Sequence, residues 1–253
     1  MVRKENTIST PVTNRVALIT GGSGGIGRVV AERLAQDGLA VAVQYAGNQA
    51  RAEDTVAAIT AAGGRALAVG GDVADENAMS AAFDAVESAF GGIDVVVNTA
   101  GIMILAPIAA FDLADLDRMH RTNIRGTFVV SQQAARRVRP GGAIVNFSTS
   151  VVRTQLPTYG AYVASKAAVE GLTLILAREL RGRDITVNAV APGPTATPLF
   201  LNGKDEATIA KFAQATPLQR LGRPEDIAEV VSFLAGPARW VNAQVIYANG
   251  GLA

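Results

Sequence analysis

Tyr162 and Lys166 are the residues best suited to chemistry, because they lie four positions apart in an alanine-rich segment predicted to be helical. On a helix, side chains at this spacing face the same way. A tyrosine is a poor acid or base near neutral pH, but a neighbouring ammonium group favours its ionised form. The pair could therefore move a proton to or from a substrate oxygen. The spacing is common by chance in helices, so its meaning depends on what precedes it.

A glycine-rich turn at residues 20–27 (TGGSGGIG) is the second feature with chemical meaning. It directly follows the apolar run 16–19 and precedes a segment predicted to be a helix. In that context the glycines allow a dinucleotide pyrophosphate to approach the helix N-terminus, where free N–H groups favour an anion. The alternative is a structural turn without a ligand. Together with Tyr162 and Lys166, the turn predicts hydride transfer between a nicotinamide and a carbonyl carbon.

Short apolar runs alternate with alanine-rich helical segments along the chain. Strands are expected near residues 16–19, 41–43, 66–69, 95–97, 143–147, 186–190 and 244–247, and helices near 26–36, 52–61, 79–90, 113–138 and 160–181. This alternation predicts an α/β fold, a Rossmann-type doubly wound parallel sheet of about seven strands with helices on both faces. Residues 14–253 are expected to form one domain, preceded by a flexible extension over residues 1–13.

Composition excludes several classes of function. The chain has 23 basic and 22 acidic residues, so no broad field attracts nucleic acid. It has no cysteine and one histidine, which argues against disulfides and against a catalytic metal. We expect no apolar run of the ~20 residues that a membrane helix needs, and the polar start lacks a signal-peptide core. These features predict a cytoplasmic protein that binds neither nucleic acid nor membrane.

The motifs, in this order, resemble the short-chain dehydrogenase/reductase family over about residues 14–251. Residues 98–101 (NTAG) resemble its Asn-Asn-Ala-Gly element, with Thr99 as a departure, and residues 192–197 resemble the segment that covers the nicotinamide. Residues 148–150 and 188–195 look most like bacterial tetrahydroxynaphthalene and 3-oxoacyl-carrier-protein reductases. The predicted cofactor contacts are Gly21, Ser23, Gly24, Gly25, Ile26, Gly27, Tyr45, Asn48, Asp72, Val73, Asn98, Ala100, Gly101, Tyr162, Lys166, Pro192, Gly193, Thr195 and Thr197.

The resemblance implies two further catalytic positions. Asn123 matches the asparagine that holds a water in a proton relay to the lysine. The family usually places a serine thirteen residues before the tyrosine to hold the substrate oxygen, and here that position is Thr149. A threonine hydroxyl can donate the same hydrogen bond, although Ser148 or Ser150 could serve instead. The predicted catalytic residues are Asn123, Thr149, Tyr162 and Lys166.

The end of the second strand separates NADP(H) from NAD(H). An NAD-selective site usually has an acid there, about 20 residues after the glycines. This chain has residues 44–49 (QYAGNQ) and no acid before Glu53. A 2′-phosphate would meet no carboxylate, and Asn48 and Arg51 could hydrogen-bond it. NADPH/NADP is therefore favoured over NADH/NAD, even though Gly24 stands where NADP-selective relatives often carry a basic residue.

Apolar residues near the predicted strand ends, including Met103, Leu156 and segment 195–201, predict an uncharged ketone or secondary alcohol as substrate. The helix near 160–181 has more apolar positions than one contact with a sheet requires. Because relatives form tetramers through this helix, we expect a homotetramer, with a dimer second.

The leading interpretation is an NADPH-dependent carbonyl reductase, reversible as a secondary-alcohol dehydrogenase, with Tyr162 as proton donor. One alternative is a catalytically inactive dinucleotide-binding sensor or scaffold, which the departure at Thr149 keeps open. Others are an NAD-dependent alcohol dehydrogenase of the same family and a nucleotide-sugar epimerase or dehydratase, although the last are usually longer. The natural substrate does not follow from these patterns.

Overall fold

The computed structural model describes residues 15–253, which form one seven-stranded parallel sheet in the order β3-β2-β1-β4-β5-β6-β7. The predicted Rossmann-type sheet is confirmed, and the expected extension over residues 1–13 lies outside the described residues. The strands are β1 (Val16–Thr20), β2 (Ala40–Tyr45), β3 (Arg65–Gly70), β4 (Ile93–Asn98), β5 (Val138–Phe147), β6 (Thr186–Pro192) and β7 (Val245–Ala248).

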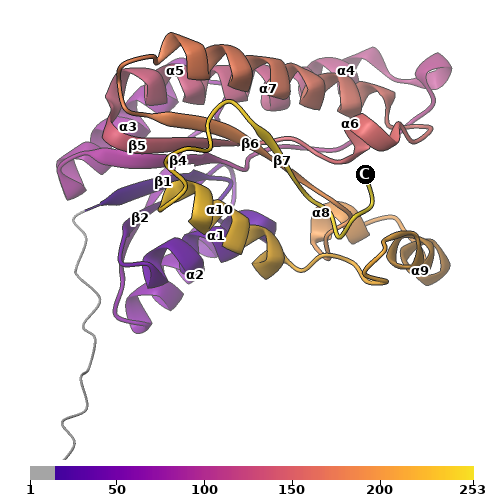
Figure 1. Cartoon of the computed structure of the whole chain (residues 1–253), viewed down its shortest axis with the longest axis horizontal. Helices are drawn as coiled ribbons and strands as arrows, with labels where there is room; N and C mark the ends of the chain where they lie inside the picture. The colour runs from indigo at the N-terminus through magenta and orange to yellow at the C-terminus, as the bar shows by residue number, and fades with distance from the viewer. Residues whose placement is uncertain (1–14) are drawn as a thin grey trace, which may run out of the picture.

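Helices cover both faces of the sheet (Figure 1). One face carries α3 (Glu76–Phe90), α5 (Thr127–Arg137) and α7 (Gly160–Glu179), and the other carries α1 (Gly25–Gln36), α2 (Gln49–Ala61) and α10 (Pro224–Ala235). Each face has its own apolar cluster, with Phe83 and Met79 in the first and Leu34 and Ile227 in the second. Central strands buried on both sides need the continuous apolar runs that the sequence shows.

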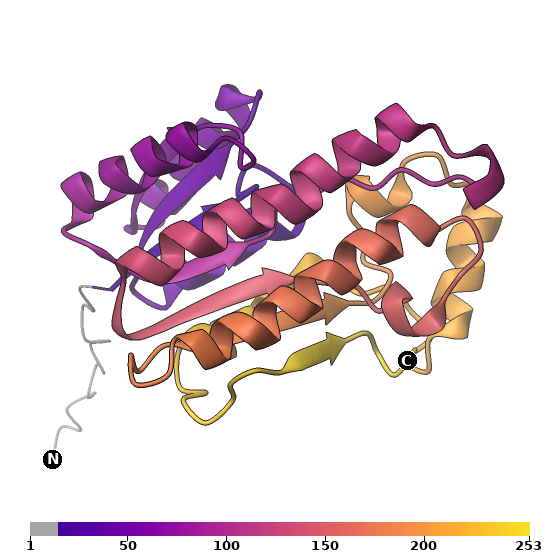
Figure 2. The ribbon, with the colours of Figure 1, turned by 90° about the horizontal axis from the view of Figure 1, so that it is seen from above.

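The strand order reverses at β1, which pairs with β2 on one side and β4 on the other. In such sheets a ligand crevice opens at the carboxyl ends of the strands beside this reversal. The short elements α6 (Val151–Thr154), α8 (Pro198–Leu201) and α9 (Glu206–Ala215) lie at that end (Figures 1 and 2). The irregular segment near 192–217 therefore stands over the crevice.

The helix expected near 113–138 is interrupted. It consists of α4 (Leu113–His120), a π-helical turn (Arg121–Gly126) and α5. A Cβ at Gly126 would lie 2.6 Å from Cγ2 of Val73, so only a glycine allows this close approach to the loop after β3. π-helical turns often mark functional positions, and this one directs Asn123 into the protein interior.

α7 contradicts the expectation about membrane helices. Among the described residues, α7 is the one helix that by length and composition alone could cross a bilayer. Here it lies along the sheet beside α5 (Figure 2), with Val169 and Leu176 buried against the strands. Its outer side leaves Leu174 and Ile175 exposed. The apolar character of α7 therefore belongs to a packed helix with an uncovered face.

A buried polar row ties the sheet to α7. Thr20 Oγ1 donates to Asn98 Oδ1 at 2.7 Å, and Asn146 Nδ2 donates to Thr173 Oγ1 at 3.0 Å. Asn98 and Asn146 are register partners on β4 and β5. Because buried amides are costly when unpaired, this row fixes α7 against the strand ends.

We expect Thr173→Val to lower the free energy of unfolding by about 1–3 kcal/mol, because the Asn146 amide loses a buried partner. Thr60→Val is the matched control, since the Thr60 hydroxyl makes the same bond to a carbonyl one turn earlier, at 2.8 Å, on an exposed helix surface. Urea denaturation of both variants measures the difference. Equal destabilisation by the two would contradict the role assigned to the row.

Candidate active site

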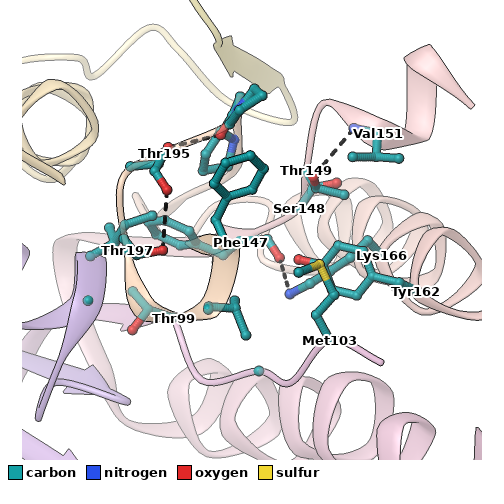
Figure 3. A pocket seen from close by; sticks show the side chains of 18 of the residues that line it. Thr99, Met103, Phe147, Ser148, Thr149, Val151, Tyr162, Lys166, Thr195 and Thr197 are labelled. Atoms are coloured by element: carbon teal, nitrogen blue, oxygen red, sulfur yellow. Dashed lines mark hydrogen bonds between the residues drawn. The ribbon is translucent and has the colours of Figure 1, made fainter. Parts of the chain in front are cut away.

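A cavity of about 350 Å³ opens at the carboxyl ends of the strands, between the glycine-rich turn and the first turns of α7 (Figure 3). Most predicted site residues line it, although they come from five separate stretches of the chain. They are Gly21, Ser23, Gly24, Gly25, Ile26, Gly27, Ala100, Gly101, Thr149, Tyr162, Lys166, Pro192, Gly193, Thr195 and Thr197.

Six predicted residues do not line the cavity, namely Tyr45, Asn48, Asp72, Val73, Asn98 and Asn123. Asn98 is buried and accepts a hydrogen bond from Thr20, so its side chain supports the glycine-rich turn from the core. Asp72 pairs with Arg121 and accepts from the backbone N–H of Ala74 at 2.9 Å. Contacts of these residues with a cofactor stay predictions.

Several positions of the glycine-rich turn require glycine, because of either backbone conformation or crowding. Gly21 and Gly25 have φ angles of +63° and +52°, and a Cβ at Gly27 would lie 2.4 Å from the carbonyl oxygen of Gly21. Gly24 precedes α1 without any side-chain cap, so the first N–H groups of α1 have no side-chain acceptor. A close-packed turn with free N–H groups at a helix start suits a pyrophosphate, as predicted.

Arg51, which the sequence indicates could bind a 2′-phosphate together with Asn48, lines the cavity. A Cβ at Gly24 would lie 2.6 Å from its Nη2, so the guanidinium occupies the space beside that glycine. Asn48 caps α2 by accepting from the backbone N–H of Arg51 at 3.1 Å, which fixes the first turn that carries the arginine. Relatives often carry a basic residue at the position of Gly24, and here Arg51 on α2 brings a positive charge to the same place. Within the described part of the chain, residues 15–253, no acidic residue lines the cavity.

Tyr162 and Lys166 are both buried on α7 (Figure 3). Lys166 Nζ donates to the carbonyl oxygen of Phe147 at 2.9 Å and lies 5.9 Å from the centre of the Tyr162 ring. Burial lowers the pKa of Lys166 to about 8 and raises the pKa of Tyr162 above its ordinary value. The Tyr162 pKa is thus raised, first by burial and then by the neighbouring Tyr159, and it is not lowered as expected from Lys166. The phenol is neutral and holds a proton to give.

Asn123 projects from the π-helical turn toward the loop after β4. Its Nδ2 donates to Ile102 O at 2.9 Å and to Ser165 Oγ at 3.0 Å, and its Oδ1 accepts from the Ile102 N–H at 2.9 Å. A Cβ at Gly101 would lie 3.3 Å from Asn123 Oδ1 and 3.4 Å from Lys166 Nζ. Asn123 and Lys166 therefore meet at Gly101, although the relay role of Asn123 stays a prediction.

Three consecutive hydroxyls, at Ser148, Thr149 and Ser150, line the cavity. They differ in their hydrogen-bond partners. Ser148 donates to the Glu170 carboxylate at 2.6 Å, and Ser150 donates to a β6 carbonyl at 3.2 Å. Thr149 Oγ1 only accepts, from the backbone N–H of Val151 at 3.3 Å (Figure 3). Among the described residues, Thr149 is thus the one of the three whose O–H proton has no acceptor.

The remaining walls are apolar. Phe200 and Phe212 meet edge to face with ring centres 5.2 Å apart, which joins α8 to α9 over the cavity. Met103 and Leu156 line the cavity, as expected, and so does Tyr159. Sequence reasoning missed Phe212, because it lies far from any predicted strand end, and it also missed Leu252, which follows the last predicted strand. The apolar side chains that line this part are Met103, Val151, Leu156, Tyr159, Leu199, Phe200, Phe212 and Leu252.

Residues 21–253 match a family model described as enoyl-(acyl carrier protein) reductase. A short-chain type dehydrogenase/reductase from Picea abies is 44% identical over 248 residues, which cover 94% of this chain and 92% of the relative. The chain belongs to the short-chain dehydrogenase/reductase family. It is therefore an NAD(P)-dependent oxidoreductase, and the predicted resemblance is confirmed.

Two further members of this family are similar over nearly their whole length. A chloroplastic NADPH-dependent aldehyde reductase-like protein from Arabidopsis thaliana is 40% identical, with 95% of each chain covered. The crystal structure of a short-chain dehydrogenase from Burkholderia cenocepacia in complex with NADP has a TM-score of 0.89 and 40% identity. It covers 95% of this chain and 98% of that one.

We expect Lys166→Met to be more stable than the wild type at pH 7, by up to about 3 kcal/mol. The pKa of Lys166 is about 8 in the folded protein, below its unfolded value of about 10.4. The unfolded chain therefore binds more protons between these values, and wild-type stability rises across that pH interval. The stability difference should shrink from pH 8 to pH 10. Urea denaturation at pH 7 and 9.5 measures it.

Lys211→Met is the control for this measurement, because Lys211 is exposed and its charge stays in solvent. Its effect on stability should not change over the same pH range. A Lys166→Met difference that is equally independent of pH would contradict the buried-charge argument.

Proposed function

We propose that the protein is an NADPH-dependent carbonyl reductase for uncharged, apolar ketones and aldehydes, reversible as a secondary-alcohol dehydrogenase. The observation that carries the proposal is one cavity with the glycine-rich turn at one end and Tyr162, Lys166 and Thr149 at the other. A nucleotide is held by the first group of residues, and a carbonyl oxygen by the second.

The chain's own residues handle the oxygen and the proton. NADPH, when bound, supplies a hydride to the carbonyl carbon. The free Thr149 O–H donates to the carbonyl oxygen and orients it, and Tyr162 gives its phenolic proton to that oxygen as the alkoxide forms. Lys166, with a pKa of about 8, returns a proton to Tyr162 near neutral pH. One hydride and one proton convert C=O to CH–OH.

The preference for NADPH rests on charge at the adenosine end. Arg51 presents a guanidinium, which binds phosphate oxygens through paired hydrogen bonds, and Asn48 has an amide N–H₂ available beside it. The absence of an acid among the lining residues removes the group that would repel a 2′-phosphate. The Burkholderia relative with NADP and the Arabidopsis NADPH-dependent reductase agree with this preference.

The preference for an uncharged substrate rests on the walls of the cavity. Arg51 and Lys166 are the two cationic side chains that line it, and both belong to the nucleotide and proton-transfer parts. The other walls around the substrate end combine aliphatic and aromatic side chains with neutral hydroxyls, those of Ser148, Thr149 and Ser150 among them. Transfer of an ionised substrate group into such surroundings is unfavourable without a partner.

We also propose that the protein assembles as a homotetramer in the cytoplasm. α7 exposes Leu174 and Ile175, and the neighbouring α5 exposes Phe128. Only 39% of the most apolar stretch of α7 is buried within one chain. The remaining surface of the helix is therefore available for contact with another copy. A two-fold dimer is the simpler alternative, and sedimentation velocity separates the two.

Tyr162→Phe tests the reaction. We expect turnover of a ketone panel to fall by about 10²–10⁴-fold, the usual contribution of a positioned general acid. NADPH binding, measured by nicotinamide fluorescence, should persist. Tyr159→Phe is the control, because Tyr159 lies in the same wall and should keep its turnover. Near-normal turnover in Tyr162→Phe would reject the mechanism, and NADPH binding without turnover in the wild type would favour the sensor.

Arg51→Met tests the cofactor preference. We expect kcat/KM for NADPH to fall by about 10–100-fold, the scale of one lost charge-assisted hydrogen bond, with kcat/KM for NADH little changed. Arg28→Met is the control, because Arg28 pairs with Glu32 on the surface of α1 at 2.8 Å. Parallel losses with both nucleotides would show that Arg51 does not read the 2′-phosphate.

A further inference from the structure

The loop between β5 and α7 forms one wall of the cavity and is firmly held only at its two ends. At the first end, the N–H groups of Ser148 and Ser150 donate to the β6 carbonyls of Val190 and Pro192 at 2.8 and 2.9 Å. At the far end, Thr158 O accepts from the Ala106 N–H at 3.2 Å. Between these anchors the main chain makes only local hydrogen bonds.

This middle part has little stability of its own. α6 spans four residues, and a helix of that length is not stable in isolation. It is followed by Gln155, whose φ of +50° is unusual for a residue other than glycine. Side chains from this stretch nevertheless line the cavity, namely Val151, Thr154 and Leu156.

One long-range polar contact holds the middle of the loop. The guanidinium carbon of Arg153 lies 3.9 Å from the centre of the Tyr247 ring, within the range of a cation–π contact. Tyr247 belongs to β7, where it is the register partner of Ala191 on β6. Ala191 O in turn accepts from Ser150 Oγ. The stack therefore fastens α6 to the same strands that fix the start of the loop.

The stack also determines where the Arg153 charge lies. Arg153 is not among the lining residues of the cavity, although Val151 and Thr154 on the same short helix are. Its guanidinium is turned toward β7 and away from the apolar walls. Without the Tyr247 ring, the exposed and flexible arginine side chain would be free to reach the rim of the cavity.

We propose that the Arg153–Tyr247 stack is a specificity-determining contact, in which both residues act as positioning residues. It keeps the substrate-facing loop in place and holds a cation outside the cavity, so that uncharged carbonyl compounds are preferred over carboxylate-bearing ones of the same shape. This inference rests on the proposed carbonyl reduction.

Three variants and two substrates separate these effects. Tyr247→Leu removes the ring and frees Arg153, Arg153→Met removes the cation, and Tyr247→Phe keeps the ring face without the hydroxyl. Benzaldehyde and 4-carboxybenzaldehyde serve as the uncharged and anionic substrates. The NADPH dissociation constant, measured in each variant, shows whether the fold and the nucleotide end are intact.

We expect Tyr247→Leu and Arg153→Met each to raise KM for benzaldehyde about three- to tenfold, the scale of one cation–π contact, with kcat nearly unchanged. Only Tyr247→Leu should also shift the kcat/KM ratio, by at least threefold in favour of 4-carboxybenzaldehyde, because only there is a cation released. Tyr247→Phe keeps the ring face but loses the hydroxyl's contact with Arg153, so it should lie closer to the wild type than to Tyr247→Leu in both quantities. Wild-type KM values and substrate ratios in Tyr247→Leu would overturn the proposal.

Hydrogen–deuterium exchange tests the stack without any turnover. Amides of residues 152–156 should exchange faster in Tyr247→Leu and Arg153→Met than in the wild type and Tyr247→Phe. If the wild type reduces no carbonyl compound, the proposed function fails while this measurement still decides whether the stack holds the loop. Unchanged exchange in both variants would overturn the contact itself.

Discussion

The burial of the Lys166 ammonium is the constraint on which the rest of the site depends. A charge removed from water needs a partner, and Lys166 finds one in the carbonyl oxygen of Phe147 at the end of β5. That bond ties α7 to the sheet edge and sets where Tyr162 lies, one turn earlier on the same helix. The same hydrogen bond offsets part of the free-energy cost of burying the Lys166 ammonium. The pKa of this group, about 8, suits proton exchange near neutral pH. The buried ammonium makes the folded protein less stable, but it places an ionisable group with this pKa inside the cavity.

The surrounding backbone is shaped to allow this burial. Gly101 leaves room for both Asn123 and Lys166, and a side chain there would lie 3.3–3.4 Å from each. The π-helical turn brings Asn123 inward, where its amide closes three hydrogen bonds with the loop after β4 and with Ser165. The buried row through Asn146 and Thr173 holds the next turns of α7 against the strands. Proton transfer thus rests on contacts made by several elements, and none of them acts alone.

Much of the fold and part of the site could be predicted from the sequence, because they depend on local patterns. The strand positions follow from apolar runs, and the glycine-rich turn follows from spacing. Features that depend on contacts between residues far apart in the sequence could not be predicted from it. Arg51 reaches Gly24 from α2, Phe212 reaches the cavity from α9, and the Tyr162 pKa is raised by burial that no spacing reveals. The surplus of apolar positions in the helix near 160–181 is visible in the sequence, but which of them are exposed, Leu174 and Ile175, is not.

The departure at Thr149 shows how structure changes the meaning of a sequence difference. Counting from the tyrosine points to a threonine where the family has a serine, which by sequence alone is compatible with lost activity. In the structure the adjacent serines are already engaged, one by Glu170 and one by β6, whereas the Thr149 proton has no acceptor. A hydroxyl that faces the cavity with its proton free satisfies the chemical requirement whether or not it carries a methyl group. The threonine therefore keeps a hydrogen-bond donor at the cavity, which supports the role proposed for Thr149 and weakens the argument for the sensor interpretation.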